Sequence, residues 1–165
     1  MCTKFIRNCS EKSVVAYKVI EVRLQTRRDS IGRPIKSAHA HSPFCYYGWK
    51  KGINNAIGAI DPLGRSIIHD GVFHCFPTIR EAKRWIKYCN EKPISMPGHA
   101  IIRVKLSGNI IVGAHHNFCY SFDESPCICG SIATWDGRVL MNNKYMTLLQ
   151  ARNLMIKKAK KKNGH

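Results

Sequence analysis

The segment 115–129 holds five side chains of the types that bind zinc. Zinc favours a tetrahedral set of thiolate and imidazole ligands, so a site drawn from this segment is chemically feasible. Cys127 and Cys129 are closer in sequence than a usual ligand pair, yet on a strand both would face the same side. The alternative is a set of unrelated thiols and surface histidines. The candidate zinc ligands are His115, His116, Cys119, Cys127 and Cys129.

Four histidines suggest a second kind of chemistry, which is acid–base catalysis of RNA cleavage. His39 and His41 lie in an arginine-rich segment, and His69 and His74 flank a predicted strand. An imidazole titrates near neutral pH and therefore serves as a general acid or base. The alternative is that these residues are ordinary polar loop and strand positions. Because the sequence does not assemble a nucleophile, a base and an orienting acid, we assign no catalytic residue.

Charge is the strongest signal in the sequence. The 165 residues contain 27 Lys and Arg against 10 Asp and Glu, which gives a formal net charge of +17. Such a charge repels itself, and a polyanion would neutralise it, so we expect a nucleic acid as the partner. Its phosphates would be contacted by Arg27, Arg28, Arg33, Lys36, Lys50, Lys51, Arg80, Lys83, Arg84, Lys87, Lys157, Lys158, Lys160, Lys161 and Lys162.

Aromatic side chains precede one pair of these lysines. Tyr46, Tyr47 and Trp49 would stack on bases while the neighbouring ammonium groups meet phosphates, although packing in the core is the alternative role. Because no helix-turn-helix or zinc-finger pattern is visible, RNA or a ribonucleoprotein is favoured over a DNA groove. A different class of partner is an acidic protein surface, which an adaptor or inhibitor would bind with these aromatic residues as anchors.

Composition places the chain among folded proteins of a reducing compartment. Hydrophobic residues make up 44% and charged residues 22%, which is ordinary globular usage. No apolar run approaches the roughly 20 residues that span a bilayer, and the first ten residues hold no apolar signal core. We therefore expect a cytoplasmic protein, in the host cytoplasm if a phage encodes it. The eight cysteines are then expected as thiols or metal ligands and not as disulfides.

Periodicity predicts the elements that would position these residues. Residues 14–25 alternate in the way that is typical of a strand. Residues 26–43 have almost no hydrophobic period, which predicts a long basic loop. Residues 71–76 predict a short strand. Thr78 and Glu81 form the pattern of a capping box, and the apolar stripe that follows predicts a helix.

The second half of the chain predicts further strands and a last helix. Residues 100–106 and 110–112 predict a hairpin about a Gly-Asn turn, residues 114–130 are irregular, and residues 132–141 suggest two strands. Thr147 is the expected cap of a helix that ends in lysines. We therefore expect an α+β fold, with a small, mainly antiparallel sheet, one central capped helix and a basic C-terminal helix. Residues 1–146 would form one domain and residues 147–165 the C-terminal helix with its lysine-rich tail.

The order of three segments resembles an uncharacterised domain of phage and prophage proteins. The segments are Ala16-Tyr17-Lys18-Val19-Ile20, Gly71-Val72-Phe73-His74-Cys75-Phe76 with the helix start after it, and the stretch from Ile102 to Ile111. This resemblance implies a protein of a mobile element that inhibits a host defence or nucleic-acid machine.

The same order also resembles the ADP-ribosyltransferase fold. Lys18 stands where a first-strand Arg would be expected, Phe76-Pro77-Thr78 occupies the middle position, and the chain has no Glu after Glu124. Asp136 alone would supply a late carboxylate, one methylene shorter, so the usual transferase activity is not expected. A small transferase or a small nuclease remains the enzymatic alternative to a binding protein.

Overall fold

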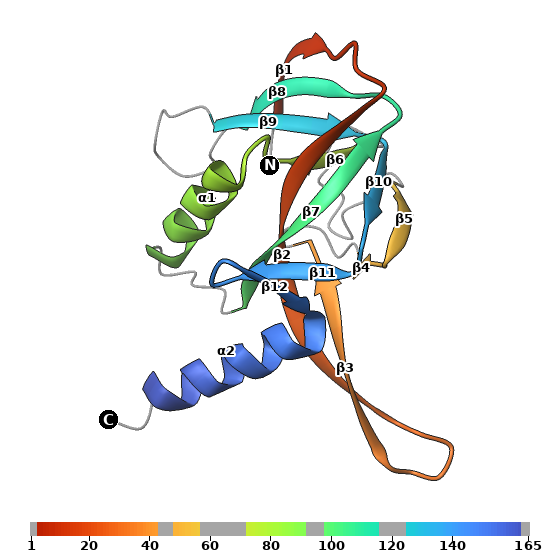
Figure 1. Ribbon diagram of the computed structural model, residues 1–165, viewed down its shortest axis with the longest axis vertical. Helices are drawn as coiled ribbons and strands as arrows, with labels where there is room; N and C mark the ends of the chain where they lie inside the picture. The colour runs from red at the N-terminus through yellow and green to blue at the C-terminus, as the bar shows by residue number, and fades with distance from the viewer. Residues whose placement is uncertain (1–2, 43–47, 57–71, 92–97, 116–124, 163–165) are drawn as a thin grey trace, which may run out of the picture.

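Two antiparallel sheets and two helices make up the part of the chain that the computed structural model describes, which is residues 3–42, 48–56, 72–91, 98–115 and 125–162 (Figure 1). The strands are β1 (Thr3–Asn8), β2 (Ser13–Arg28), β3 (Pro34–His41), β4 (Gly48–Trp49), β5 (Gly52–Asn55), β6 (Phe73–Cys75), β7 (His99–Ser107), β8 (Ile111–His115), β9 (Ser125–Gly130), β10 (Ile132–Trp135), β11 (Arg138–Met141) and β12 (Lys144–Thr147). The helices are α1 (Ile79–Glu91) and α2 (Leu148–Lys162).

The larger sheet is built around β2. Its strand order is β12-β11-β7-β2-β3-β4, and β10 pairs with both β7 and β5. β2 changes partners along its 16 residues: Ser13–Glu21 pairs with β7, whereas Glu21–Arg28 pairs with β3. The first half of β2 therefore belongs to the body of the protein. The second half forms a two-stranded ribbon with β3 that leaves the body, at the bottom of Figure 1.

The smaller sheet has the order β1-β8-β9-β6 and joins the larger one through β2. Tyr17 and Phe76 exchange two backbone hydrogen bonds of 2.8 and 2.7 Å, so the end of β6 continues onto the outer side of β2. Lys18 adds a side-chain contact, because its Nζ donates to the His74 carbonyl at 2.8 Å. These bonds fix the two sheets against each other.

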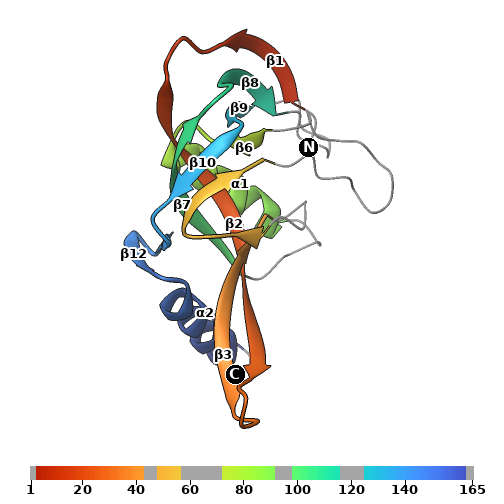
Figure 2. The same ribbon diagram turned by 90° about the vertical axis from the view of Figure 1, so that its right-hand side faces the viewer.

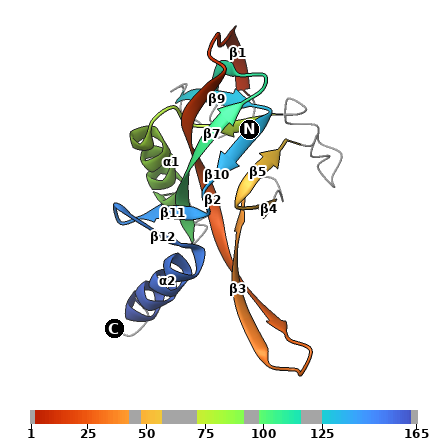
Figure 3. The ribbon, with the colours of Figure 1, turned by 45° about the vertical axis from the view of Figure 1, so that its right-hand side comes forward.

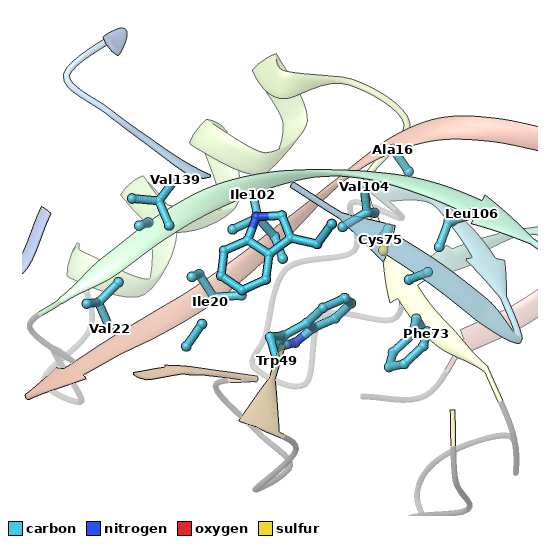
Figure 4. Packing of buried hydrophobic residues seen from close by; sticks show 14 of the residues in the cluster. Ala16, Ile20, Val22, Trp49, Phe73, Cys75, Ile102, Val104, Leu106 and Val139 are labelled. Carbon is cyan, nitrogen blue, oxygen red and sulfur yellow. The ribbon is translucent and has the colours of Figure 1, made fainter. Parts of the chain in front are cut away.

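The main core lies against the larger sheet and also includes residues of β6 and α2. Ile20, Ile102 and Leu106 are fully buried in it, and the Trp49 and Phe73 rings pack 4.7 Å apart (Figure 4). Alternation along β2 sends Val19 to the opposite face, where it joins a second cluster under α1 that includes Trp85. Figure 2 shows α1 and α2 as separate coverings of the larger sheet. Both faces of β2 are thus covered in the body.

Both helices begin with the caps that the sequence predicts. The Thr78 N–H donates to Glu81 Oε2 at 3.0 Å and the Glu81 N–H donates to Thr78 Oγ1 at 3.3 Å, which is the capping box. Ala82 and Trp85 then face inward. Thr147 caps α2 in the same way, with Gln150 as its partner. Among the described residues, no helix is long and apolar enough to cross a membrane.

The fold class is only partly as expected. The described chain is mostly antiparallel sheet with two helices, so mainly-β describes it better than α+β. The predicted hairpin of residues 100–112 is wrong, because β7 and β8 belong to different sheets. Both edges of β7 are already paired, with β2 on one side and β10 and β11 on the other. The chain after Ser107 therefore turns away to pair with β1 and β9.

Two further regions of sheet differ in how well they were predicted. The two strands expected within 132–141 are present as β10 and β11, and the irregular segment 114–130 contains β9. β11 continues into a tight hairpin with β12 that the pattern did not reveal. Its turn residues Asn142 and Asn143 both have positive φ, of 51° and 61°, as a two-residue hairpin of type I′ requires.

Candidate nucleic-acid interface

The predicted basic loop of residues 26–43 is wrong in its described part, because most of it is a β-ribbon. β2 runs on to Arg28, and β3 pairs with it from Pro34↔Arg28 back to His41↔Glu21. The ribbon lacks a hydrophobic period because it stands clear of the body and buries neither face beyond its base. We define residues 25–37 as the arm, which points away from the body in Figure 3.

The arm carries four cations and one acid. The cations are Arg27, Arg28, Arg33 and Lys36, and the acid is Asp29. The three arginine side chains are exposed. Arg27 Nε donates to the neutral Gln25 side chain at 3.2 Å. Among the described residues, the ion pair of the ribbon is Arg23 with Glu21 at 2.7 Å, which lies at the base and outside the arm. The field of the arm is therefore positive.

α2 supports the base of the ribbon and brings further cations to the same end of the molecule. Ala151 is fully buried in the cluster that contains Val22 and Ala40, and Met155 packs against that cluster. Lys157 is exposed in the second half of this helix. The rest of the predicted lysine tail falls within α2 at Lys158, Lys160, Lys161 and Lys162. Figure 1 shows α2 and the arm together at the lower end.

The other predicted phosphate contacts lie elsewhere. Lys50 and Lys51 are exposed in the turn between β4 and β5, which Asn54 holds by bonds to the Lys50 backbone of 2.9 and 2.8 Å. The cations of α1 are exposed too, but α1 covers the body far from the arm in Figures 1 and 3. These cations are Arg80, Lys83, Arg84 and Lys87. The structure thus divides the predicted residues among separate surfaces.

Of the predicted stacking residues, the structure describes Trp49. Trp49 is only 5% exposed, packs against Phe73, and donates its indole N–H to Ser42 Oγ at 3.0 Å. It therefore belongs to the core and is not available to stack on a base, which corrects the prediction for this residue. Tyr46 and Tyr47 lie outside the described residues.

The three histidines of this set that the structure describes do not form one site. His39 and His41 are neighbours on one face of β3, with ring centroids 6.4 Å apart, and His39 Nε2 lies 2.9 Å from Ser37 Oγ. His74 is buried on β6, far along the chain, and His69 lies outside the described residues. Burial, helped by the charges of Arg23 and His39, lowers the pKa of His41, and Glu21 opposes this change. A nuclease pair at His39 and His41 stays a prediction.

His99 is a histidine that the sequence did not single out. It pairs with Glu21 across β2 and β7, and its ring packs edge-to-face with the Trp85 ring, with centroids 5.6 Å apart. Neither ring nitrogen has a hydrogen-bond partner among the described residues. Burial lowers the pKa of His99, and the Glu21 charge opposes this only in part. The folded protein therefore favours the neutral ring.

We expect acid to destabilise the protein through His99. An unfolded chain binds a proton near pH 6.5, whereas the folded chain resists protonation, so stability falls as pH drops below about 6.5. The variant His99→Phe keeps a ring against Trp85 but does not titrate. Between pH 7.5 and 5.5 its free energy of unfolding, measured in urea, should fall less than that of the wild type. An equal loss of unfolding free energy in the variant and the wild type would contradict the role given to His99.

The predicted zinc ligands are brought together only in part. Cys127 and Cys129 face the same side of β9, as predicted for a strand, with their Sγ atoms 4.0 Å apart. His74 Nδ1 lies 3.5 Å from Cys129 Sγ, across the β6–β9 pairing. Within the described part of the chain, no three side chains are grouped so that they would hold a metal ion. The His115 side chain, His116 and Cys119 lie outside what is described, so zinc stays a prediction.

The buried thiols should react slowly with alkylating agents. Burial raises the pKa of Cys75 to about 12, and the contact with Cys127 together with burial raises the pKa of Cys129. At pH 8 a thiol with a pKa near 12 has roughly a thousandth of the thiolate of an ordinary cysteine.

Mass spectrometry after brief iodoacetamide treatment of native protein should find the partly exposed Cys9 modified and Cys75 and Cys129 intact. In denaturant all three should react. Modification of Cys75 as fast as Cys9 in the native protein would contradict this. Zinc analysis of the same chelator-washed sample tests the metal, and less than about half an equivalent per chain would end that prediction.

The positions that carry the resemblance to ADP-ribosyltransferases have structural roles here. Lys18 is bonded to the His74 carbonyl, Phe76 is buried beside β2, and Thr78 caps α1. Asp136 Oδ1 accepts a hydrogen bond from the Arg138 N–H at 2.9 Å in a turn. Glu124 lies outside the described residues.

The sequence matches no family model, no curated protein and no solved structure. The resemblances to phage domains and to transferases therefore stay predictions, and the case for function depends on the geometry and charge of the chain itself.

Proposed function

We propose that this protein binds nucleic acid, and that the arm is its principal contact surface. The observation that carries the proposal is a two-stranded ribbon, projecting from a well-packed body, that bears four cations and one acid. Projecting backbone with exposed side chains adds little to the core. Its cationic character is best explained by a polyanionic partner.

The three arginine charges of the arm are not neutralised within the described structure. No described carboxylate pairs with Arg27, Arg28 or Arg33. The one acid of the arm, Asp29, accepts hydrogen bonds from the backbone N–H groups of Ile31 and Arg33 and so is committed to the turn. The guanidinium groups are therefore left for an external anion, and a guanidinium binds phosphate oxygens in a bidentate way.

α2 would extend this surface. The lysines of α2 lie at the same end of the molecule as the arm, whereas α1 lies over the body. This surface suits RNA or a ribonucleoprotein, which the sequence favoured, and it also suits duplex DNA. An inhibitor of a host defence or nucleic-acid machine would use the same surface, and so would an adaptor for an acidic protein.

Salt dependence tests the proposal. A labelled 30-base-pair DNA and a 30-nucleotide RNA are titrated at several salt concentrations with wild type and with the variant R27Q/R28Q/R33Q. For duplex DNA, the slope of log K against log salt changes by about 0.9 for each phosphate contact. The variant should therefore have a slope shallower by about 2.7, and weaker binding at low salt, because three contacts are lost.

The matched control removes the same charge from another surface. The variant R80Q/K83Q/K87Q loses three cations of α1, and we expect its slope to stay close to that of the wild type. Equal effects of both variants would mean that total charge, and not the arm, sets the affinity. Failure of the wild type to bind either oligonucleotide at low salt would overturn the proposal and favour the acidic protein.

A further inference from the structure

The tip of the arm is held rigid by its own hydrogen bonds. Asp29 Oδ1 accepts from the N–H groups of Ile31 and Arg33, at 3.0 and 2.7 Å. The Gly32 N–H donates to the Asp29 carbonyl at 3.0 Å, and the Asp29 N–H donates to the Arg33 carbonyl at 2.9 Å. Gly32 has a φ of 80°, which favours glycine. Four bonds thus fix a five-residue loop in one shape.

This loop presents an isoleucine to solvent at the point of the arm. Ile31 is 68% exposed, and the exposed Arg28 and Arg33 lie on either side of it in the chain, at the two ends of the loop. A second isoleucine, Ile35, is 52% exposed on the flank of the arm, opposite Arg27 in the register. An ordered loop that displays a large apolar side chain between cations suits a partner that is anionic outside and apolar within.

Arginine side chains of the arm point in two opposite directions. Arg27 and Arg28 are consecutive strand residues and therefore point to opposite faces of the ribbon. Each groove of a nucleic acid duplex is bordered by two rows of phosphates. Inside a groove, each face of the ribbon would lie against one of these rows. From Gln25 to Asp29 the strand covers about 13 Å, which exceeds the depth of either groove of B-DNA, about 7.5 to 8.5 Å. The arm is therefore long enough to bring its tip to the bases.

We propose that the arm enters the minor groove of duplex DNA and that Ile31 acts as a wedge, inserted between neighbouring base pairs. This inference rests on the proposed function and specifies its ligand. A ribbon with side chains is wider than the unbent minor groove, which is about 6 Å wide. Insertion of an apolar wedge unstacks one base step and kinks the duplex toward the major groove, which opens the minor groove. Insertion of Ile31 and entry of the wide ribbon therefore both require a duplex that is kinked and has an opened minor groove.

The observations favour DNA over two other anionic partners. The A-form duplex of RNA has a major groove too narrow for side chains to read and a shallow minor groove, so neither suits a projecting arm. An anionic bilayer would attract the arginines, but interfacial binding depends on a broad apolar face, and the arm offers only Ile31 and Ile35. Stacked base pairs bordered by phosphates accommodate a single apolar side chain.

The experiment measures bending and binding separately. A 25-base-pair DNA carries a donor and an acceptor dye at its ends, and a second version has a one-nucleotide gap at the centre. We expect saturating wild type to raise energy transfer on the intact duplex, as a kink of about 20–90° would. It should also bind the gapped duplex about tenfold more tightly, because the gap removes part of the cost of unstacking.

Two matched variants identify the wedge. Ile31→Ser should still bind with an unchanged salt slope, but the rise in energy transfer and the preference for the gap should be lost. Ile35→Ser removes the same side chain from the flank of the arm, and it should bend DNA as the wild type does.

Four outcomes would overturn the wedge. The first is salt-dependent binding by the wild type without bending or preference for the gap, which leaves the proposed function standing. The second is equal loss of bending in both serine variants. The third is tighter binding of an RNA duplex of the same sequence. The fourth is Ile31-dependent binding to vesicles of phosphatidylserine and phosphatidylcholine without bending of DNA. Absence of any nucleic-acid binding would instead remove the proposed function itself.

Discussion

Replacing residues 26–36 by the dipeptide Asn-Gly is expected to weaken nucleic-acid binding about 100-fold or more while the protein stays folded. The described side chains from Thr26 to Ile35 are exposed, except for Asp29, which is partly buried by its own turn. None of them belongs to a core cluster. Their removal therefore costs the body almost no buried apolar surface.

The register of the ribbon shows where the shortened hairpin should close. Hydrogen-bonded and non-hydrogen-bonded pairs alternate along an antiparallel ladder. Since the Asp29 N–H donates to the Arg33 carbonyl, the pair Gln25↔Ser37, four positions toward the base, is also of the hydrogen-bonded type. An Asn-Gly dipeptide forms the type I′ turn that closes such a pair with the right twist. The base of the ribbon under α2 should be unaffected.

The expected loss of affinity is large because the deletion removes four cations together. A hydrogen bond to a charged group contributes roughly 1.5–3 kcal/mol, so losing only two such contacts weakens binding about 100-fold or more. We expect binding to a 30-base-pair DNA in about 50 mM salt to fall by at least that factor. Titration by fluorescence anisotropy measures it.

Unfolding in urea is the control for this variant. Its free energy of unfolding should lie within about 0.5 kcal/mol of the wild type, as for other changes on an exposed surface. A folded, truncated protein that binds with full affinity would move the contact surface to α1 or to the lysines of α2. A truncated protein that does not fold would contradict the independence of the body from the arm.

The sequence predicted local structure well where the pattern and the caps agree. α1 follows a capping box and has a clear apolar stripe, and α2 begins at the predicted Thr147. In both helices the decisive contacts are three to four residues apart, within reach of pattern reasoning. The two strands of residues 132–141 were also predicted, although they pair with other strands and not with each other.

The sequence did not predict which strands pair. The expected hairpin at Gly108 does not form because β7 is already flanked on both edges, a fact set by residues far away in the chain. The actual two-residue hairpin closes at Asn142 and Asn143, which the periodicity passed over. Sheet order depends on contacts between distant segments, and no local pattern encodes them.

The candidate site shows the same division between local and distant information. The cations of the arm were identified, but the segment was interpreted as a loop because an exposed ribbon has no buried face and hence no hydrophobic period. Asp29 and Gly32 between two polar runs were the available sign of a turn. The common face of Cys127 and Cys129 was predictable from their spacing, whereas their contact with His74 required the pairing of β6 with β9.

The largest stability effect is expected from Trp135→Ala. Trp135 is 2% exposed in the main core, and its indole N–H donates to the Arg138 carbonyl at 2.8 Å. It lies on β10 at the position that pairs with both Gly52 of β5 and Val104 of β7. Truncating it leaves a large cavity where three strands meet and removes one hydrogen bond.

Loss of a buried tryptophan costs about 3–5 kcal/mol, against a total stability of about 5–15 kcal/mol for a natural domain. We expect urea unfolding to report a loss in this range and the melting temperature to fall by about 10 °C or more. Trp135→Phe should lose less, because it retains a ring in the core. Tyr145→Ala on the neighbouring hairpin, where the side chain is 41% exposed, should cost under about 1 kcal/mol.

These three variants separate burial from the mere loss of an aromatic ring. If Trp135→Ala and Tyr145→Ala were equally mild, with unchanged dependence on urea, the packing of β10 between β5 and β7 would be wrong. The pairing of β10 with β5 also sets the position of β5 and of the turn that carries Lys50 and Lys51. In addition, the Lys51 side chain lies beside Gly137, two residues after Trp135. The Ala variant should therefore weaken the body while leaving the arm, which is anchored by β2 and α2, able to bind DNA below the transition.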